Sequence, residues 1–184
     1  MGIIRKDFKY KIIKNFLSKD ETTLTNSYLQ LKHLNNENNF EINQNKQLDT
    51  CLMGDPLIES ILIIKLKKFE EVCGLKLLPT YGYSRFYTKY ASLKKHTDRK
   101  SCEISLTVFT GSDGTPWPFE IDNKSFLQEP GDALIYLGCE IEHERKEFLG
   151  DWHSQFFIHY VDAEGPNKEL IFDKRGRLGV WREY

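Results

Sequence analysis

At residues 93–99 the chain reads Leu-Lys-Lys-His-Thr-Asp-Arg, and the interpretation of the whole sequence starts from this stretch. Side chains two residues apart on an extended segment lie on the same face, so His96 and Asp98 would point in one direction. A further histidine, His143, lies in the later segment Ile-Glu-His-Glu-Arg. Two imidazoles and one carboxylate leave three positions of an octahedral ion open, an arrangement that non-haem iron sites use. The three residues therefore predict a metal site.

The composition indicates one folded domain. A chain of 184 residues with 40% hydrophobic residues is long enough for a sizeable core. The formal net charge of −1 argues against a nucleic-acid partner, because nonspecific binding depends on neutralising phosphates. The longest apolar run, at residues 57–64, is too short to span a bilayer, and no secretory signal is evident. The four cysteines lack CxxC spacing, so neither a zinc knuckle nor a disulfide framework is expected. We expect a cytoplasmic protein without membrane association.

The N-terminal part carries helix signals. Residues 10–17 are typical of a short apolar strand or of an entry segment, and Ser18 begins a predicted helix at the spacing of a capping box. The Asn-rich stretch at residues 35–47 predicts a mobile loop. The Asp-Pro pair at residues 55–56 predicts a second helix, which Gly74 ends. Apolar positions at helical spacing are, in the first helix, Leu24, Tyr28, Leu31 and Leu34, and in the second, Leu57, Ile61, Ile64, Leu66 and Phe69.

After Gly74 the sequence changes to strand-favouring residues. Dense aromatic and β-branched stretches occupy residues 75–90, 103–110, 133–137 and 155–161, and Gly-, Asp- and Asn-rich turns separate them. Helices followed by many short strands predict an α+β chain whose second part is a β-sandwich or barrel. The tail at residues 167–184 gives no clear signal.

The order of these features resembles a known family. Tyr87 stands nine positions before His96, the His-x-Asp pair ends at Asp98, and residues 129–136 read Glu-Pro-Gly-Asp-Ala-Leu-Ile-Tyr before His143. Between these features lie the strand at 103–110 and a hairpin at 114–121. The order is similar to that of the 2-oxoglutarate/Fe(II)-dependent oxygenases, and within them to the prolyl-4-hydroxylase-like branch.

The resemblance covers residues 78–162, about half of the chain, and implies a fold. We expect an α+β chain with a double-stranded β-helix core, the jelly-roll or cupin-like arrangement, and packing helices from the N-terminal part. Residues 1–184 would form a single oxygenase domain, with a helical part at about 18–74 and the β-helix core at about 75–162.

The resemblance also implies a chemistry. His96, Asp98 and His143 would be the catalytic residues and would bind Fe(II), while 2-oxoglutarate and O2 would be cosubstrates. The enzyme would be a dioxygenase that hydroxylates an unactivated C–H bond and releases succinate and CO2. Its substrate would be a peptidyl proline, an amino acid or another small molecule. Tyr87, Thr107 and Phe109 would line the cosubstrate pocket.

The cation that holds the far carboxylate of 2-oxoglutarate is where the sequence departs from the family. The position that the family fills with Lys or Arg is His153, which would need to be protonated. Arg145 lies two residues beyond His143, on the same face of an extended segment, and a guanidinium is the better carboxylate partner. By alignment His153 ranks slightly ahead of Arg145.

Two other kinds of protein remain open. One is a non-catalytic β-helix module that binds a metal ion or another ligand, and the other is a zinc-dependent hydrolase, for which no general base is evident. The single residues also have simpler interpretations. The His96–Asp98 pair could be a surface salt bridge, Arg145 could pair with Glu142 or Glu144, and His159 could be a core histidine.

Overall fold

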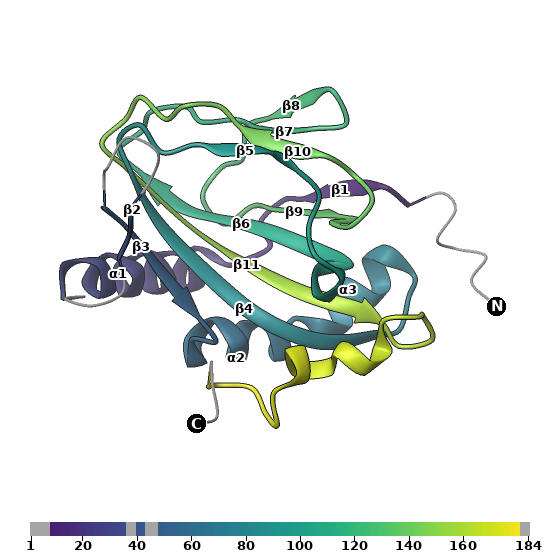
Figure 1. Ribbon diagram of the computed structural model, residues 1–184. Coiled ribbons are helices and arrows are strands. Elements are labelled where there is room, and N and C mark those ends of the chain that lie inside the picture. Colours follow the sequence, from purple (N-terminus) through teal and green to yellow (C-terminus); the bar gives the residue numbers. More distant parts are fainter. Residues whose placement is uncertain (1–7, 36–39, 43–47, 181–184) are drawn as a thin grey trace.

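The computed structural model describes residues 8–35, 40–42 and 48–180, which form two antiparallel sheets and three α-helices (Figure 1). The larger sheet has the strand order β1-β9-β6-β11-β4-β3-β2 and the smaller one β5-β10-β7-β8. The strands of the larger sheet are β1 (Tyr10–Ile13), β2 (Phe40–Ile42), β3 (Leu48–Met53), β4 (Leu77–Thr88), β6 (Ile104–Ser112), β9 (Ala133–Tyr136) and β11 (Trp152–Asp162). Those of the smaller sheet are β5 (Leu93–His96), β7 (Phe119–Ile121), β8 (Lys124–Phe126) and β10 (His143–Arg145). The helices are α1 (Lys19–Leu34), α2 (Pro56–Ile64) and α3 (Leu66–Cys73), with 3-10 turns η2 (Lys100–Cys102) and η3 (Lys168–Lys174).

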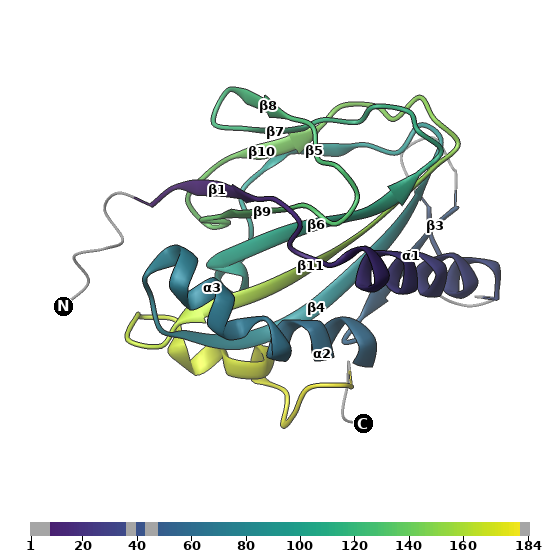
Figure 2. The ribbon, with the colours of Figure 1, turned by 180° about the vertical axis from the view of Figure 1, so that it is seen from behind.

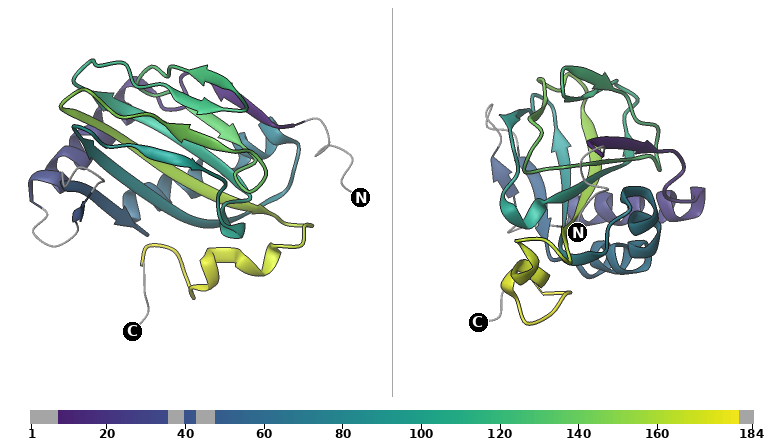
Figure 3. Two further views of the ribbon diagram at one scale, coloured as in Figure 1. Left: turned by 45° about the horizontal axis from the view of Figure 1, so that its top comes forward. Right: turned by 90° about the vertical axis from the view of Figure 1, so that its right-hand side faces the viewer.

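The larger sheet is covered on both faces. The helices lie on the side away from the smaller sheet, as Figures 2 and 3 show from further directions. One apolar cluster joins the sheet to the helices and includes Ile104, Leu106, Val108, Ile58, Leu62 and Phe69. Because side chains alternate along a strand, the remaining side chains of β6 point towards the smaller sheet. The predicted α+β double-stranded β-helix is confirmed.

Two further apolar clusters fill parts of the space between the sheets. Phe119 and Ile121 of β7 pack against Leu134 and Tyr136 of β9. A separate cluster of Tyr87, Ala91, Trp117 and Phe148 fills the end near the start of β11. The predicted metal ligands His96, Asp98 and His143 lie outside these clusters.

The helix starts follow the sequence signals. Ser18 and Glu21 form the predicted capping box, and the carboxylate of Asp55 accepts hydrogen bonds from the first turn of α2. Gly74 adopts a φ of 70° at the end of α3, a conformation that costs glycine little. The second predicted helix is divided at Lys65 into α2 and α3.

The buried faces of the helices differ from those the apolar spacing indicated. On α1, Thr22, Thr25 and Leu29 are buried, whereas Leu24, Leu31 and Leu34 are 63%, 58% and 77% exposed. The helix docks with a polar contact, since Oγ of Ser154 donates to Oδ1 of Asn26 at 2.6 Å. On α2, Ile58 and Leu62 are buried and Ile64 is 73% exposed.

The predicted N-terminal strand forms as β1, and strand pairing also occurs within the part of the chain that was predicted to be helical. Within the stretch predicted as a mobile loop, residues 36–39 and 43–47 lie outside the described residues, but residues 40–42 form β2 and pair with β3. The part expected to be helical therefore adds two strands to one edge of the larger sheet.

The C-terminal segment, whose structure could not be predicted from its pattern of residues, lies along β4 (Figure 3). Arg175 forms a buried ion pair with Glu59 of α2 at 2.7 Å and donates to the carbonyl of Thr80. Asp173 accepts two hydrogen bonds from Arg99, at 2.7 and 2.8 Å, and one from Ser101. The segment thus ties α2 and β4 to the loop that follows Asp98.

Two remaining features concern sequence predictions. None of the four cysteines, all of which lie in the described part of the chain, forms a disulfide. No helix in the described part of the chain is long and apolar enough to cross a membrane.

Candidate metal centre and adjoining cavity

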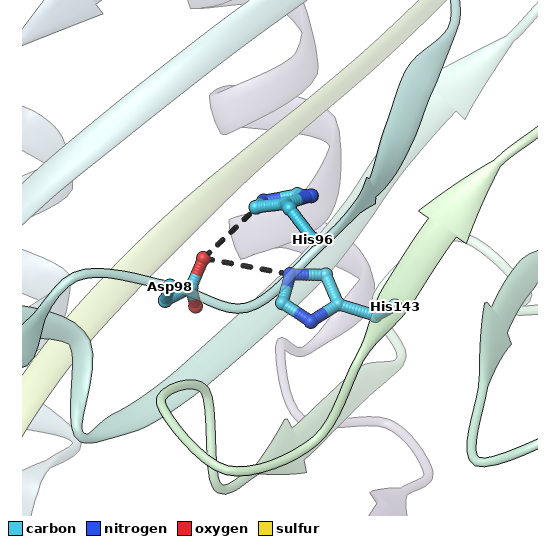
Figure 4. Close-up of side chains that lie close together, drawn as sticks. All are labelled: His96, Asp98 and His143. Carbon is cyan, nitrogen blue, oxygen red and sulfur yellow. Dashed lines mark ion pairs between the residues drawn. The ribbon is translucent and has the colours of Figure 1, made fainter.

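The three predicted metal ligands converge. His96 ends β5, His143 begins β10, and the two are paired across these antiparallel strands. Asp98 follows β5, and its Oδ1 lies 3.5 Å from Nε2 of His96 and 3.4 Å from Nε2 of His143 (Figure 4). Strand pairing therefore sets the histidines side by side, and the turn after β5 brings the carboxylate between them.

The backbone orients both imidazoles for metal binding. Nδ1 of His96 lies 2.7 Å from the carbonyl of Lys94, and Nδ1 of His143 lies 2.9 Å from that of Ile141. With Nδ1 as the donor to these carbonyls, Nε2 of each ring faces Asp98, where it donates a proton to the carboxylate or, once that proton is lost, can bind a metal ion. A metal ion fits this set, because one carboxylate oxygen and two imidazole nitrogens face one point.

Electrostatics keeps the carboxylate ionised. Burial acts to raise the pKa of Asp98, but hydrogen bonds from His143 and His96 outweigh it and hold the pKa well below its usual range. The contact with Asp98 in turn raises the pKa of His96. The Asp98 anion is thus in the protonation state that metal binding needs.

A cavity of about 150 Å³ adjoins the three ligands. Alternate residues of β4 line one wall: Tyr81, Tyr83, Arg85 and Tyr87. Tyr87, which the sequence singled out, is fully buried there, and burial raises the pKa of its hydroxyl, which therefore keeps its proton. Arg85 was not anticipated. It has the same parity as Tyr87, lies over its ring and forms an ion pair with Asp49 at 3.1 Å.

Arg145 lies inside the barrel and not at the surface. Its guanidinium packs between the rings of Trp117 and Phe119 and donates to Oε1 of Gln155 at 3.0 Å. Burial lowers the pKa of Arg145 to about 10, so it carries its charge at neutral pH. Among the described residues no carboxylate lies within ion-pair distance, and its Nε has no hydrogen-bond partner. A surface pair with Glu142 or Glu144 does not form; Glu142 pairs with Lys95.

His153 is buried in an aromatic environment that opposes protonation. Its ring stacks on Phe109 with centroids 4.5 Å apart and meets Trp117 edge-on. Burial, followed by the charge of Arg145, lowers the pKa of His153 well below its ordinary value. The surroundings of His153 therefore oppose the protonation that holding a carboxylate would need.

The inner face of β6 carries the other two predicted pocket residues. Thr107 and Phe109 are buried on the face opposite the cluster with the helices. The hydroxyl of Thr107 has no hydrogen-bond partner among the described residues. Phe109, His153, Trp117 and Arg145 also line a second cavity of about 420 Å³.

Gln155, which the sequence interpretation missed, contacts residues that line each of the two cavities. Besides accepting from Arg145, its Oε1 lies 3.2 Å from Nε2 of His153, and its Nε2 lies 3.4 Å from the hydroxyl of Tyr87. Its spacing could have revealed it, because Gln155 lies two residues after His153 and side chains at that spacing share one face of a strand.

Gly138 is a second missed residue, and it supports Asp98 directly. Its carbonyl accepts a hydrogen bond from the backbone N–H of Asp98 at 2.8 Å. A Cβ at this position would collide with Oδ2 of Asp98, the carbonyl of Cys102 and Oγ of Ser105. Only glycine fits without displacing the ligand.

Comparison with solved structures identifies the fold. A prolyl-4-hydroxylase from Pseudomonas putida has a TM-score of 0.64 and 15% identity, over 85% of this chain and 94% of that one. A Trichoplax adhaerens prolyl hydroxylase in complex with a hypoxia inducible factor peptide has a TM-score of 0.67 and 13% identity, over 92% and 89%. The chain has the fold of the 2-oxoglutarate/Fe(II) oxygenases.

Further comparisons agree with this at the level of the fold. The epimerase SnoN from nogalamycin biosynthesis, in a structure with Fe3+ and α-ketoglutarate, has a TM-score of 0.69 and 10% identity, over 97% of this chain and 90% of that one. No protein-family model and no curated protein sequence matches the chain.

Proposed function

We propose that this protein is an Fe(II)- and 2-oxoglutarate-dependent dioxygenase that hydroxylates an unactivated C–H bond and releases succinate and CO2. The observation that carries the proposal is the convergence of His96, Asp98 and His143 at the wall of an interior cavity. This donor set leaves half of an octahedral coordination sphere for a chelating cosubstrate and O2.

The residues at and beside the second cavity suit the far end of 2-oxoglutarate. Arg145 offers a buried charge that lacks a carboxylate partner among the described residues, and Thr107 offers an unused hydroxyl. With the proton on Tyr87, these groups would bind the far carboxylate of the cosubstrate. His153 and Phe109 would form the apolar wall beside it.

This arrangement gives each group a separate role in the reaction. Bound iron and 2-oxoglutarate supply the oxidising chemistry. His96, Asp98 and His143 hold the metal, Arg145 orients the cosubstrate, and the packed aromatic residues around Trp117 and Phe148 exclude water from that end. The substrate would be a peptidyl proline, an amino acid or another small molecule; the solved structures with this fold include enzymes named for prolyl hydroxylation and for epimerisation.

Binding of 2-oxoglutarate in the absence of O2 tests the proposal. The wild type should bind one equivalent when Mn(II) stands in for Fe(II), and none without a metal. His96→Ala should lose this binding, whereas Lys94→Ala, which changes an exposed side chain on the same strand, should retain it. A metal-loaded wild type that binds no 2-oxoglutarate would overturn the proposal and favour a non-catalytic metal-binding module.

A further inference from the structure

The two oxygens of Asp98 have different partners. Oδ1 faces Nε2 of both His96 and His143. Oδ2 instead accepts a hydrogen bond from Oγ of Ser105 at 2.8 Å. One oxygen therefore faces the metal site, and the other is held by the larger sheet.

Ser105 is itself held by a buried histidine. Ser105 on β6 and His159 on β11 are paired across the sheet, and both are buried. Nδ1 of His159 lies 2.9 Å from Oγ of Ser105. When the Ser105 hydroxyl donates to Asp98, Nδ1–H of His159 is the donor to Ser105, so the hydrogen bonds run from His159 through Ser105 to Asp98.

We propose that Ser105 and His159 are positioning residues that make Asp98 a ligand through Oδ1 alone. This rests on the proposed function. A carboxylate bound through both oxygens would occupy one of the three positions that the cosubstrate and O2 need. The hydrogen bond to Oδ2 keeps that oxygen away from the ion, and Gly138, where a Cβ would collide with Oδ2, leaves the room that this orientation needs.

The same region could be interpreted as a second metal site, because donor atoms of Asp98, Cys102 and His159 lie close together. The contacts argue against this. Oγ of Ser105 bridges His159 and Asp98, and the hydroxyl of Tyr81 lies 3.1 Å from Sγ of Cys102. These donor atoms are engaged in hydrogen bonds within the protein, which is the arrangement of supporting residues around a metal ligand.

Co(II) binding to the metal-free protein tests the inference, with the visible absorption of the bound ion as the spectroscopic readout. Ser105→Ala should weaken Co(II) binding by about 10-fold or more, in line with other residues that support metal ligands. The absorption spectrum should also change, because the freed oxygen alters the coordination. The melting temperature of the metal-free variant shows separately whether the substitution unfolds the protein.

A second variant and a matched control accompany it. His159→Phe should change affinity and spectrum in the same direction, and it carries the test if Ser105→Ala does not fold. Ser154→Ala removes a buried hydroxyl of the same sheet that bonds to Thr110 and Asn26, away from the ligands, and should leave both readouts unchanged.

The outcomes separate this inference from the proposed function. Wild-type affinity and spectrum in both Ser105→Ala and His159→Phe would overturn the positioning role while the proposed function stands. An equal loss in Ser154→Ala would overturn it as well, because the effect would then come from a loosened sheet. A wild type that binds no Co(II) would overturn both.

Discussion

Arg145 carries a positive charge into the barrel interior. The only polar contacts of its guanidinium among the described residues are to the carbonyl of Trp117 and the amides of Gln128 and Gln155. A buried charge is costly unless an opposite charge compensates it, and an anionic ligand would supply that compensation. Binding of an anionic ligand therefore explains the buried position of Arg145 better than a contribution to the stability of the fold does.

Replacing Arg145 should separate binding from stability. Arg145→Met should weaken 2-oxoglutarate binding to the metal-loaded protein by at least about 30-fold, because losing one member of a buried charged pair costs roughly 2–5 kcal/mol. The same change should leave the ligand-free protein equally stable or more stable, since it removes a buried charge. Calorimetric titration and chemical unfolding measure the two effects.

His153→Phe is the matched comparison for that experiment. It keeps the stack on Phe109 and should reduce 2-oxoglutarate binding much less than Arg145→Met. The opposite order would make His153 the anchor.

The comparison of His153 with Arg145 shows how much about a single residue can be predicted from the sequence. The order of motifs that resembles the oxygenase family grouped His96, Asp98 and His143 as candidate ligands, and the fold brings these three side chains together. The charge state of His153 depends on Phe109, Trp117 and Arg145, which come from three other strands or loops. No local pattern records that environment.

Gly138→Ala should disturb the metal ligand itself. The added methyl group meets Oδ2 of Asp98 and Oγ of Ser105, so the carboxylate must move. We expect Co(II) affinity to fall by about 10-fold or more, as for other contacts that support ligands. Titration monitored by absorption measures this. The comparison is Gly114→Ala, where a Cβ would meet no other atom but the φ of 95° strains the backbone, so it tests whether backbone strain alone lowers metal affinity. Unchanged affinity in Gly138→Ala would contradict the close packing around Asp98.

At the scale of elements, the C-terminal segment holds the loop that follows Asp98. Asp173 binds Arg99, which immediately follows Asp98 and lies over the ring of Tyr81 in the cavity wall. Burial acts to raise the pKa of Asp173, but hydrogen bonds from Arg99 and Ser101 lower it below its ordinary value.

Asp173→Asn should therefore destabilise the protein in a pH-dependent way. At pH 7 we expect a loss of about 1 kcal/mol, because Arg99 is half exposed and water screens the pair. A folded-state pKa below the unfolded value gives stability that is present above about pH 4 and is lost as the pH falls through the folded value. The difference between wild type and variant should thus narrow below about pH 4.

Chemical unfolding of both proteins across this pH range measures the effect. Glu169→Gln, which changes an exposed carboxylate of the same segment, should show no comparable difference at pH 7. A constant difference between wild type and Asp173→Asn at all pH values would contradict an ionic contribution.

Element ends were easier to predict than element faces. Ser18, Asp55 and Gly74 act through their own neighbours, so their roles are visible in the local sequence. The buried face of α1 depends instead on a partner elsewhere in the chain, because Asn26 bonds to Ser154. For the same reason the pairing of β2 with β3 and the contacts of the C-terminal segment were not anticipated.

At the scale of the molecule, the candidate metal ligands line one cavity between the two sheets, and the buried cation of Arg145 lines a second one. The seven-stranded sheet supplies Tyr87, Thr107 and Phe109, and the four-stranded sheet supplies His96, His143 and Arg145. The site therefore depends on how the sheets face each other. Its two ends, metal and cation, are the features that a chelating dicarboxylate would join.

Succinate formation from 2-oxoglutarate tests this account most directly. With Fe(II) and O2, the wild type should convert 2-oxoglutarate to succinate, and turnover should require the metal. His96→Ala and Arg145→Met should each lose most of this turnover, the first by losing iron and the second by losing the cosubstrate, whereas Lys94→Ala should match the wild type. A wild type that forms no succinate, or a His96→Ala variant that forms it at the wild-type rate, would contradict the account.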